Sequence, residues 1–478
     1  MIHAPHLLAA LLLAGIAPQA PSAPSAPAGE ALTFGRFGKV SVDRPAGAPA
    51  RVAILISGDG GPDRTTGDLT RALAADGALV LGVDVRTYLR SIRASKASCA
   101  YAAADFEALS KFAQLKLALP AYRPPVLVGY SSGATLAYAT LAEAPPTTFR
   151  GAVTFGFCPS LAIEKPLCRG RGLESRSLPG KVVFEPAKSL AEPWVELHGD
   201  LDLVCREGRT QDFVARVPGA ELVDLSRVGH GFANVERWRK PLAQALARMT
   251  RDDAPAAPRA PAVADLPLVE VPAATVPGNP GNPSTDRFAV VLSGDGGWAG
   301  IDRDVAGALA AQGIPVVGWN SLSYFWTQRS PDQGARDLAR LLRHYQTAWK
   351  RQRIVLVGYS FGADVLPSFA SRLPADLLQK VDLIALLGPG RTASYEFHLS
   401  DWLGGAGGDE LPVLPEVEKL RGRRLLCLYG KEEDDSLCPL LDQPQAESIG
   451  FEGSHHFGGD YAALASRILS RLPSAARP

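Results

Sequence analysis

An internal repeat constrains this chain more than any other feature of its sequence. Four blocks recur in the same order and at similar spacing in its two halves. The paired blocks begin at Arg51 and Phe288 (RVAILISGDGGP and FAVVLSGDGGW), at Val126 and Ile354 (VLVGYSSGATLAY and IVLVGYSFGADVL), at Glu196 and Cys427 (ELHGDLDLVC and CLYGKEEDDSLC), and at Gly229 and Gly453 (GHGF and GSHHF). Blocks that recur in a fixed order indicate a duplicated unit. We therefore expect two similar domains.

Each half alternates short apolar runs rich in β-branched residues with helical stretches such as Leu69–Ala75 and Phe106–Leu115. Unbroken apolar strands between helices are typical of a parallel sheet covered on both faces, so we predict an α/β fold for each half. The expected strands are Val52–Ile56, Leu79–Val83, Val126–Val128 and Val195–Leu197 in the first half, and Ala289–Leu292, Pro315–Gly318, Ile354–Val357 and Leu425–Tyr429 in the second.

The ends and the middle of the chain set the predicted boundaries. An apolar run from Leu7 to Ala17, followed by small residues at 26–28, is typical of a signal peptide over residues 1–28. A stretch rich in Pro and Ala predicts a linker over residues 251–285, which leaves domains at 29–250 and 286–478. Because the early run is too short to span a membrane and no later run suffices, we expect an exported, periplasmic protein.

Charge and cysteine content narrow the chemistry. Lys and Arg number 50 against 49 Asp and Glu, so no bulk positive field is present to hold nucleic acid. Six cysteines in an exported chain could form three disulfides. We predict Cys427–Cys438 first and Cys158–Cys168 second. Cys99 and Cys205 remain as a third pair, for which two free thiols are an equal alternative. We expect neither a metal nor a cofactor, because zinc-type spacings, a P-loop and a dinucleotide-binding motif are all missing from the sequence.

The motif G-x-S-x-G stands at Gly358–Gly362, between an expected strand and an expected helix over Ala363–Leu373. In that context the serine lies on a sharp turn that exposes its hydroxyl, so we predict Ser360 as a nucleophile in an α/β-hydrolase-like domain. Such a serine needs a histidine base and a carboxylate that orients it, in the chain order Ser, acid, His.

Several residues compete for the two partner roles. Glu432, Glu433, Asp434 and Asp435 all follow the strand that ends at Tyr429. Asp435 lies three residues before Cys438, as Asp202 lies three before Cys205, so we choose Asp435 with Asp434 second. By alignment with His230, we choose His455 as the base over His456. The oxyanion donors would be the N–H of Phe361 and the glycine-rich loop Ser293–Trp298, at Gly294 and Asp295.

The first half contains a matching set, Ser131, Asp202 and His230. It predicts either a second active site or a scaffold that retains ancestral residues. We favour a structural or substrate-presenting role, because the segments that would shape a substrate differ more between the halves than the triads do.

The combination of SGDGGW, GWNSLSYFW, VGYSFGAD, LGPGRTASYEFHLSDWLG, YGKEEDDSLCP and GSHHFGGDY resembles the VirJ/AcvB family of bacterial virulence proteins, in its long, two-domain, AcvB-like form. The resemblance implies a periplasmic α/β-hydrolase-like protein whose C-terminal domain hydrolyses aminoacylated phosphatidylglycerol, notably lysyl-phosphatidylglycerol, and so alters membrane lipid charge and virulence. Ser360 is the nucleophile it implies. The chain departs from the family at Asn320, where we expect Asp.

Such a substrate calls for two kinds of binding residue. A lysyl ammonium would favour a carboxylate, for which Asp295, Glu396 and Asp401 are candidates, and Trp298, Tyr324, Phe325, Trp326 and Trp402 could form an apolar wall, with ordinary core packing as the alternative. The partner would be an aminoacylated phospholipid at a membrane surface. Two other functions stay open: a general carboxylesterase or lipase, and a non-catalytic periplasmic partner of secretion-system proteins.

Overall fold

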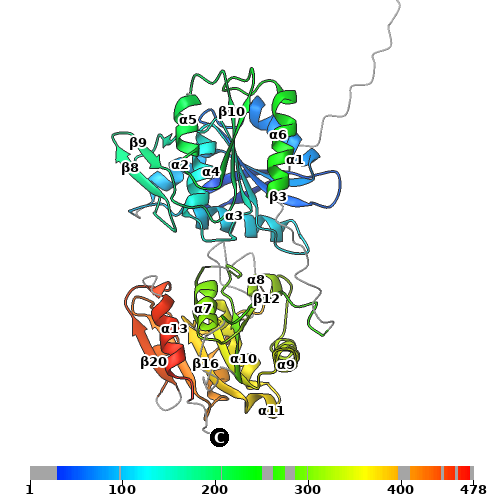
Figure 1. Ribbon diagram of the computed structural model, residues 1–478, viewed down its shortest axis with the longest axis vertical. Coiled ribbons are helices and arrows are strands. Elements are labelled where there is room, and N and C mark those ends of the chain that lie inside the picture. The colour runs from blue at the N-terminus through cyan, green and yellow to red at the C-terminus, as the bar shows by residue number, and fades with distance from the viewer. Residues whose placement is uncertain are drawn as a thin grey trace, which may run out of the picture.

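The computed structural model describes residues 30–95, 98–205, 207–249, 262–274, 286–298, 300–396, 410–442, 446–457 and 461–473. The predicted signal peptide, Asp401 and Trp402 lie outside these residues. The two halves form two lobes, each built on its own sheet (Figure 1). The sheets are mostly parallel, so the α/β prediction is confirmed.

The first lobe has an eight-stranded sheet in the order β1-β2-β4-β3-β5-β6-β10-β11. Strands β4 to β11 of that order are parallel, and β2 and β1 extend the edge in antiparallel pairing. Its elements are β1 (Glu30–Phe34), β2 (Gly38–Asp43), β3 (Arg51–Ile56), α1 (Arg64–Ala75), β4 (Ala78–Val83), α2 (Val85–Ala94), α3 (Ala102–Lys116), β5 (Val126–Tyr130), α4 (Ser132–Glu143), β6 (Gly151–Phe155), β7 (Ser160–Leu161), β8 (Glu174–Leu178), β9 (Lys181–Glu185), β10 (Trp194–Gly199), α5 (Glu207–Val214), β11 (Ala220–Leu225) and α6 (Val235–Arg248).

The second lobe repeats the parallel part of this sheet. Its order is β12-β14-β13-β15-β16-β19-β20, with β12 antiparallel at the edge. Its elements are β12 (Leu268–Val271), β13 (Arg287–Leu292), α7 (Gly300–Ala311), β14 (Val316–Trp319), α8 (Ser321–Tyr324), α9 (Pro331–Trp349), β15 (Arg353–Tyr359), α10 (Phe361–Ser371), α11 (Ala375–Leu378), β16 (Val381–Leu387), β17 (Thr392–Ala393), β18 (Leu411–Pro412), α12 (Leu414–Glu418), β19 (Leu425–Gly430), β20 (Glu447–Phe451) and α13 (Tyr461–Ser470).

The predicted strands all form, and each is slightly longer than or shifted from its predicted range. Central strands such as β5, β13 and β16 are buried along their whole length, as their unbroken apolar sequences require. One part of the predicted linker differs from expectation: Leu268–Val271 forms β12 and pairs with β14. Only Leu268 of this strand is buried, and Glu270 is exposed, which fits a strand at the edge of the sheet. The boundaries of the domains themselves remain a prediction.

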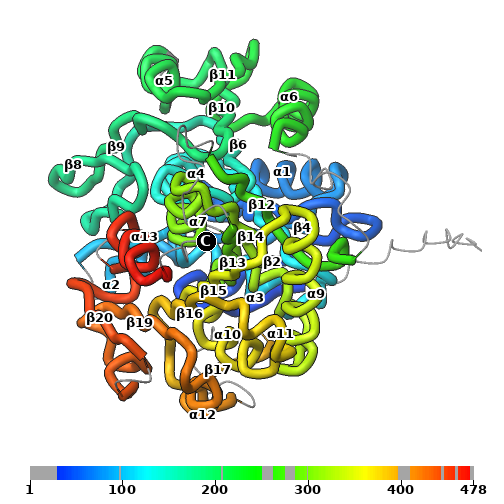
Figure 2. Tube along the Cα trace, turned by 60° about the horizontal axis from the view of Figure 1, so that its bottom comes forward, coloured from blue at the N-terminus to red at the C-terminus, as the bar shows by residue number. Residues whose placement is uncertain are grey.

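Helices cover both faces of each sheet. In the first lobe one face packs against α2, α3 and α4, and the other against α1 and α6. In the second lobe α9 and α10 cover one face, and α7 and α13 the other. Figure 1 shows helices on both sides of each sheet, and Figure 2 shows α5 and α6 on either side of β10 and β11.

The lobes stack head to tail. Lys111 in α3 donates from Nζ to the backbone carbonyl of Asp295 at 3.0 Å, and the Trp326 indole N–H donates to the carbonyl of Leu119 at 2.8 Å. Leu119 precedes β5, so it belongs to the amino edge of the first sheet. Asp295 follows β13, so it belongs to the carboxyl edge of the second. The first lobe thus covers part of the carboxyl edge of the second sheet, where Ser360 lies. The carboxyl edge of the first sheet, where Ser131 lies, is at the opposite end of the first lobe from these contacts.

The structure contains three disulfides, and two of the predicted pairings are wrong. Cys427–Cys438 is confirmed, but the other bonds are Cys99–Cys168 and Cys158–Cys205. Cys158 follows β6 and Cys205 follows β10, and these strands are neighbours in the sheet, so the tertiary fold places the two loops together. Closeness in sequence favoured Cys168, which the fold instead places beside Cys99 through a bridge between Ala100 and Leu167.

Candidate active sites

Each lobe presents one serine on a strained turn between a parallel strand and a helix. Ser131 joins β5 to α4 with φ 55° and ψ −121°, and Ser360 joins β15 to α10 with φ 51° and ψ −123°. Non-glycine residues rarely adopt such positive φ values, and a strained serine at the end of a strand is the hallmark of a nucleophile elbow. The prediction of the elbow at Ser360 agrees with this geometry.

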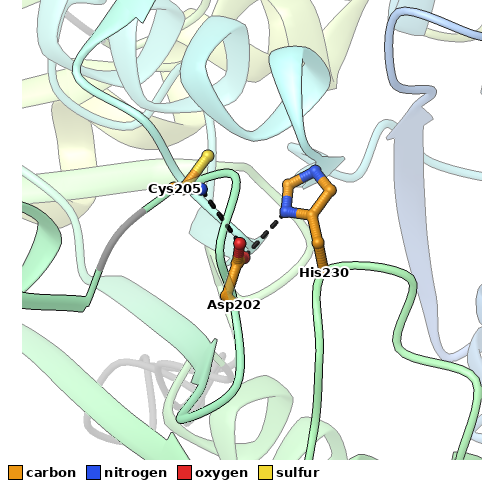
Figure 3. Close-up of side chains that lie close together, drawn as sticks. All are labelled: Asp202, Cys205 and His230. Atoms are coloured by element: carbon orange, nitrogen blue, oxygen red, sulfur yellow. Dashed lines mark hydrogen bonds and ion pairs between the residues drawn. The ribbon is translucent and has the colours of Figure 1, made fainter.

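The first lobe holds a complete triad. Ser131 Oγ lies 3.0 Å from His230 Nε2, and His230 Nδ1 lies 2.7 Å from Asp202 Oδ2. Figure 3 shows Asp202 between His230 and the backbone of Cys205, whose N–H donates to Oδ1 at 2.9 Å. Burial alone would raise the pKa of Asp202, but hydrogen bonds from His230, Cys205 and Val204 outweigh it and hold the pKa below its ordinary value. Asp202 therefore stays ionised and can orient the imidazole.

The sulfur in Figure 3 is not available to a metal ion. Asp202, Cys205 and His230 each have one ligand-type atom within 4.8 Å of the others, which is the spacing of a metal site. However, Cys205 is bonded to Cys158, and a disulfide has no thiolate to offer. The cluster is therefore the acid and base of a triad next to a disulfide.

In the second lobe, the acid predicted from the sequence is wrong. His455 Nδ1 lies 2.8 Å from Glu433 Oε2, and Glu433 Oε1 accepts the N–H of Gly430 at 2.6 Å. Only 7% of the Glu433 side chain is accessible, whereas Asp435 and Asp434 are exposed. The carboxylate paired with His455 is therefore Glu433 and not Asp435.

The error came from aligning the halves on their cysteines. Cys205 bonds to Cys158, but Cys438 bonds within its own segment to Cys427, so the two are not structural equivalents. Counting from the strand ends gives the correct match. The N–H of Asp202 donates to Gly199 O and that of Glu433 to Gly430 O, both at 3.0 Å, so each acid occupies the third position after its strand.

The choice of His455 over His456 agrees with the same comparison. Phe232 N donates to Gly229 O and Phe457 N donates to Ser454 O, which makes His230 and His455 equivalent residues of one turn. His456 instead lies 3.3 Å from the hydroxyl of Tyr359 through its Nδ1.

A glycine beside each histidine makes room for it. A Cβ at Gly388 would lie 2.8 Å from His455 Cε1, and a Cβ at Gly156 would lie 3.1 Å from His230 Cε1. The preceding carbonyls, of Leu387 and Phe155, accept the N–H of Ser360 and Ser131 at 2.8 and 2.9 Å. The nucleophile and the base thus approach the same strand end in both lobes.

The two triads also differ in the hydrogen bond between serine and histidine. In the described part of the chain, Ser360 makes no hydrogen bond to His455, whereas Ser131 is already bonded to His230. Such bonds often form only when substrate binds, so the difference does not exclude Ser360 as a nucleophile.

The predicted oxyanion residues surround Ser360. Phe361 is the first residue of α10, where backbone N–H groups point out of the helix N-terminus. A Cβ at Gly294 would lie 3.4 Å from Ser360 Cβ, so this loop touches the nucleophile. Ser293 fixes the loop, since its Oγ accepts the N–H of Ser321 at 2.9 Å. Lys111 anchors the carbonyl of Asp295 from the other lobe.

The predicted aromatic wall is core packing instead. Trp298, Tyr324, Phe325 and Trp326 are each at most 6% exposed. The Trp298 ring covers Gly318, the Tyr324 hydroxyl donates to Asp337 at 2.6 Å, and the Trp326 indole bonds to Leu119. Large rings in a sheet-and-helix core are buried because that removes most apolar area from water. Glu396 is half-buried, and its role remains a prediction.

Sequence reasoning also overlooked Asp364 in α10, four residues after Ser360. Its Oδ1 accepts the N–H of Gly390 at 2.7 Å. Burial raises the pKa of Asp364 well above its ordinary value, and the negative charges of Asp435, Asp295 and Glu410 raise it further. The spacing of four residues, which places this carboxylate one helical turn after the elbow serine, is the signal in the sequence that could have identified Asp364.

A family comparison matches both lobes. The model of the bacterial virulence protein VirJ matches residues 50–156 and 286–476, which together make up more than half of the chain. The chain belongs to the VirJ family. The resemblance noted from the sequence motifs is confirmed, and no curated protein matches the chain.

Solved structures similar to the chain include hydrolases. The esterase domain of a Rhodothermus marinus protein is 17% identical over 46% of this chain and 97% of its own, with a TM-score of 0.32. An α/β serine hydrolase without a lid from Xanthomonas campestris is 20% identical over 49% and 99%, also with a TM-score of 0.32. A thermophilic esterase from the Planctomycetes species Thermogutta terrifontis is 16% identical over 46% and 92%, with a TM-score of 0.33. The sheet order and the two elbows define the fold.

Proposed function

We propose that this VirJ-family protein is a periplasmic serine hydrolase whose Ser360 site cleaves the aminoacyl ester of lysyl-phosphatidylglycerol. The observation that carries the proposal is the loop after β19, where Glu433 binds His455 beside the elbow serine and is flanked by further carboxylates. This loop combines the machinery for ester cleavage with negative charge at the same place.

The chemistry follows from the residues. Ser360 Oγ attacks the carbonyl carbon of the aminoacyl ester while His455 takes the hydroxyl proton. The N–H of Phe361 and the loop at Gly294 stabilise the oxyanion. As the carbon–oxygen bond to glycerol breaks, His455 returns the proton to the departing oxygen. Water then attacks the acyl-enzyme, and lysine is released.

The choice of a cationic substrate is supported by local charge. Glu432, Asp434 and Asp435 are exposed beside Glu433, and Asp295 is exposed on the oxyanion loop. Their charges reach the site, since Asp435 and Asp295 both raise the pKa of Asp364. Lys431 begins the same loop and Arg391 donates to the carbonyl of Asp434. Carboxylates outnumber these cations, so an ammonium-bearing acyl group suits this site better than a neutral one.

The compartment is supported by the disulfides. Three disulfides are typical of proteins outside the reducing cytosol. Among the described helices, none combines the length and the apolar character needed to cross a membrane. The periplasm and the contact with a membrane surface are part of the proposal.

The test uses the full chain and vesicles that contain lysyl-phosphatidylglycerol, with release of free lysine as the readout. We expect Ser360→Ala to abolish release and Ser131→Ala to retain it. Cleavage of a short acyl ester at Ser360 without any release of lysine would favour the general carboxylesterase. Failure of a fluorophosphonate to label either serine would favour a non-catalytic partner of a secretion system.

A further inference from the structure

The loop that carries Asp202 has a surface unlike that of its counterpart in the second lobe. Leu201, Leu203 and Val204, here called the apolar rim, are 59%, 86% and 66% exposed. They flank the acid of the Ser131 triad. In the second lobe, the equivalent loop flanks Glu433 with Glu432, Asp434 and Asp435. The two triads are thus bordered by side chains of opposite character.

The rim is held in place. Leu201 N donates to Val228 O at 3.0 Å, and Asp202 Oδ1 accepts the N–H of Val204 and Cys205, both at 2.9 Å. The Cys158–Cys205 bond ties the end of the loop to the end of β6. The exposure of the rim therefore belongs to a defined conformation. Apolar side chains fixed in water next to the acid of a triad indicate a contact surface for an apolar group.

The triad shows no sign of decay. Ser131 keeps the strained elbow at φ 55°, Gly156 keeps the space for His230, and Asp202 is only 4% exposed. A strained backbone and a buried carboxylate both cost free energy, and neither is needed to hold a sheet together. A scaffold would lose nothing by relaxing them.

The oxyanion loop of the first lobe is also in place. A Cβ at Gly58 would lie 3.1 Å from Ser131 Cβ, and Ser57 Oγ accepts the N–H of Val85 at 3.1 Å, as Ser293 does for Ser321. Ser132 opens α4, so its N–H lies at the helix N-terminus next to the nucleophile. Donors are available where negative charge would develop on an ester carbonyl.

We propose that Ser131, His230 and Asp202 form a second, independent catalytic centre that hydrolyses carboxylic esters with an apolar acyl chain, which the rim contacts. This inference does not rest on the function proposed for Ser360. The head-to-tail stacking supports independence, because the contacts between the lobes use the amino edge of the first sheet and leave its triad at the opposite edge.

The reaction balances with water as the only co-reactant. Ser131 Oγ bonds to the acyl carbon as the bond from that carbon to the alcohol oxygen breaks. His230 Nε2 takes the serine proton and passes it to the alcohol. Water then attacks the acyl-enzyme, gives its proton to His230, and the acid leaves as the proton returns to Ser131. Asp202 stays ionised throughout.

The test compares Ser360→Ala with the double variant Ser131→Ala, Ser360→Ala in the full chain. Substrates are p-nitrophenyl acetate, butyrate and octanoate below their aggregation limits, with vesicles of diacyl phosphatidylglycerol in a separate arm. We expect Ser360→Ala to hydrolyse the esters with kcat/KM rising with chain length, and the double variant to be inactive. A fluorophosphonate should label the Ser131 peptide in Ser360→Ala.

A separate variant tests whether the apolar rim contacts the acyl chain. Leu203→Ser should lower the ratio of octanoate to acetate turnover about fivefold, since it removes an apolar contact that only the longer acyl chain makes. Leu178→Ser, at a half-exposed leucine of β8, is the matched control and should change neither rate.

Fatty acid released from the vesicles would identify a lipid as the ester source, and turnover of the monomeric esters alone would identify a soluble ester. Turnover of neither by Ser360→Ala, together with an unlabelled Ser131, would overturn the proposal. So would a rate that does not depend on acyl length. None of these results depends on whether Ser360 releases lysine, so the two proposals can fail separately.

Discussion

Replacing Glu433 by glutamine tests the most specific feature of the second site. Glutamine has nearly the same shape and can still accept the N–H of Gly430, which Glu433 binds at 2.6 Å. Its amide nitrogen, however, would face His455 Nδ1, where the carboxylate now lies at 2.8 Å. The histidine must then carry its proton on Nε2. That nitrogen would face Ser360 as a hydrogen-bond donor, so it could not accept the serine proton.

The expected fall in kcat has two causes, the loss of a charged hydrogen bond and the wrong tautomer of His455. A hydrogen bond to a charged partner contributes about 1.5–3 kcal/mol, which is roughly 10- to 150-fold in rate. The wrong tautomer adds to this, and the corresponding change of Asp to Asn in a serine protease triad lowers kcat about 10⁴-fold. We expect a loss of that size in kcat and little change in KM, because Glu433 does not contact the substrate in the proposed mechanism.

The assay measures lysine release from lysyl-phosphatidylglycerol vesicles and turnover of p-nitrophenyl acetate, both in a Ser131→Ala background. Asp435→Asn is the matched control, since Asp435 is exposed in the same loop, and it should change kcat less than about threefold. A loss of about a thousandfold in Asp435→Asn, or a kcat of Glu433→Gln within about tenfold of the parent, would refute the role of Glu433.

Three further predictions use other parts of the molecule. Lys111→Met should lower turnover at Ser360 about tenfold and leave turnover at Ser131 unaffected, because Lys111 Nζ holds the carbonyl of Asp295 on the oxyanion loop. Separate kcat values in the Ser131→Ala and Ser360→Ala backgrounds check this. Equal losses at both sites would contradict it. Cys158→Ala with Cys205→Ala should lower the melting temperature and reduce ester turnover at Ser131 but not at Ser360, because this disulfide fixes the loop of Asp202. Burial raises the pKa of Glu143 from 4.5 to about 8. Between these two pH values the folded protein keeps a proton on Glu143 that the unfolded chain releases. The free energy of unfolding therefore falls as pH rises from about 4.5 to about 8. Glu143→Gln should therefore become more stable than the parent as pH rises from 5 to 9, by up to about 4–5 kcal/mol; parallel urea unfolding curves with no pH-dependent difference would contradict this.

Much of the fold could be predicted because the relevant information is local. Unbroken apolar runs such as Val52–Ile56 and Ile354–Val357 predicted β3 and β15, and the repeat of blocks predicted two similar sheets. The elbow at Ser360 was visible as well, since the glycines on either side of it are required by close backbone packing within a few residues. The histidine His455 followed from the equivalent turn in the first half.

The sequence by itself determined two α/β units, an elbow serine in each and a histidine base near each end, because periodicity and tight turns are properties of neighbouring residues. Tertiary structure alone decided that Glu433 and not Asp435 meets His455, that Cys158 joins Cys205, and that Trp298, Tyr324 and Trp326 are core. It also placed Lys111 of one lobe against the oxyanion loop of the other. These outcomes depend on which strand ends and loops become neighbours in space. The acids keep the same position after their strands, but the cysteines do not, so an alignment on the cysteines misplaces the acid.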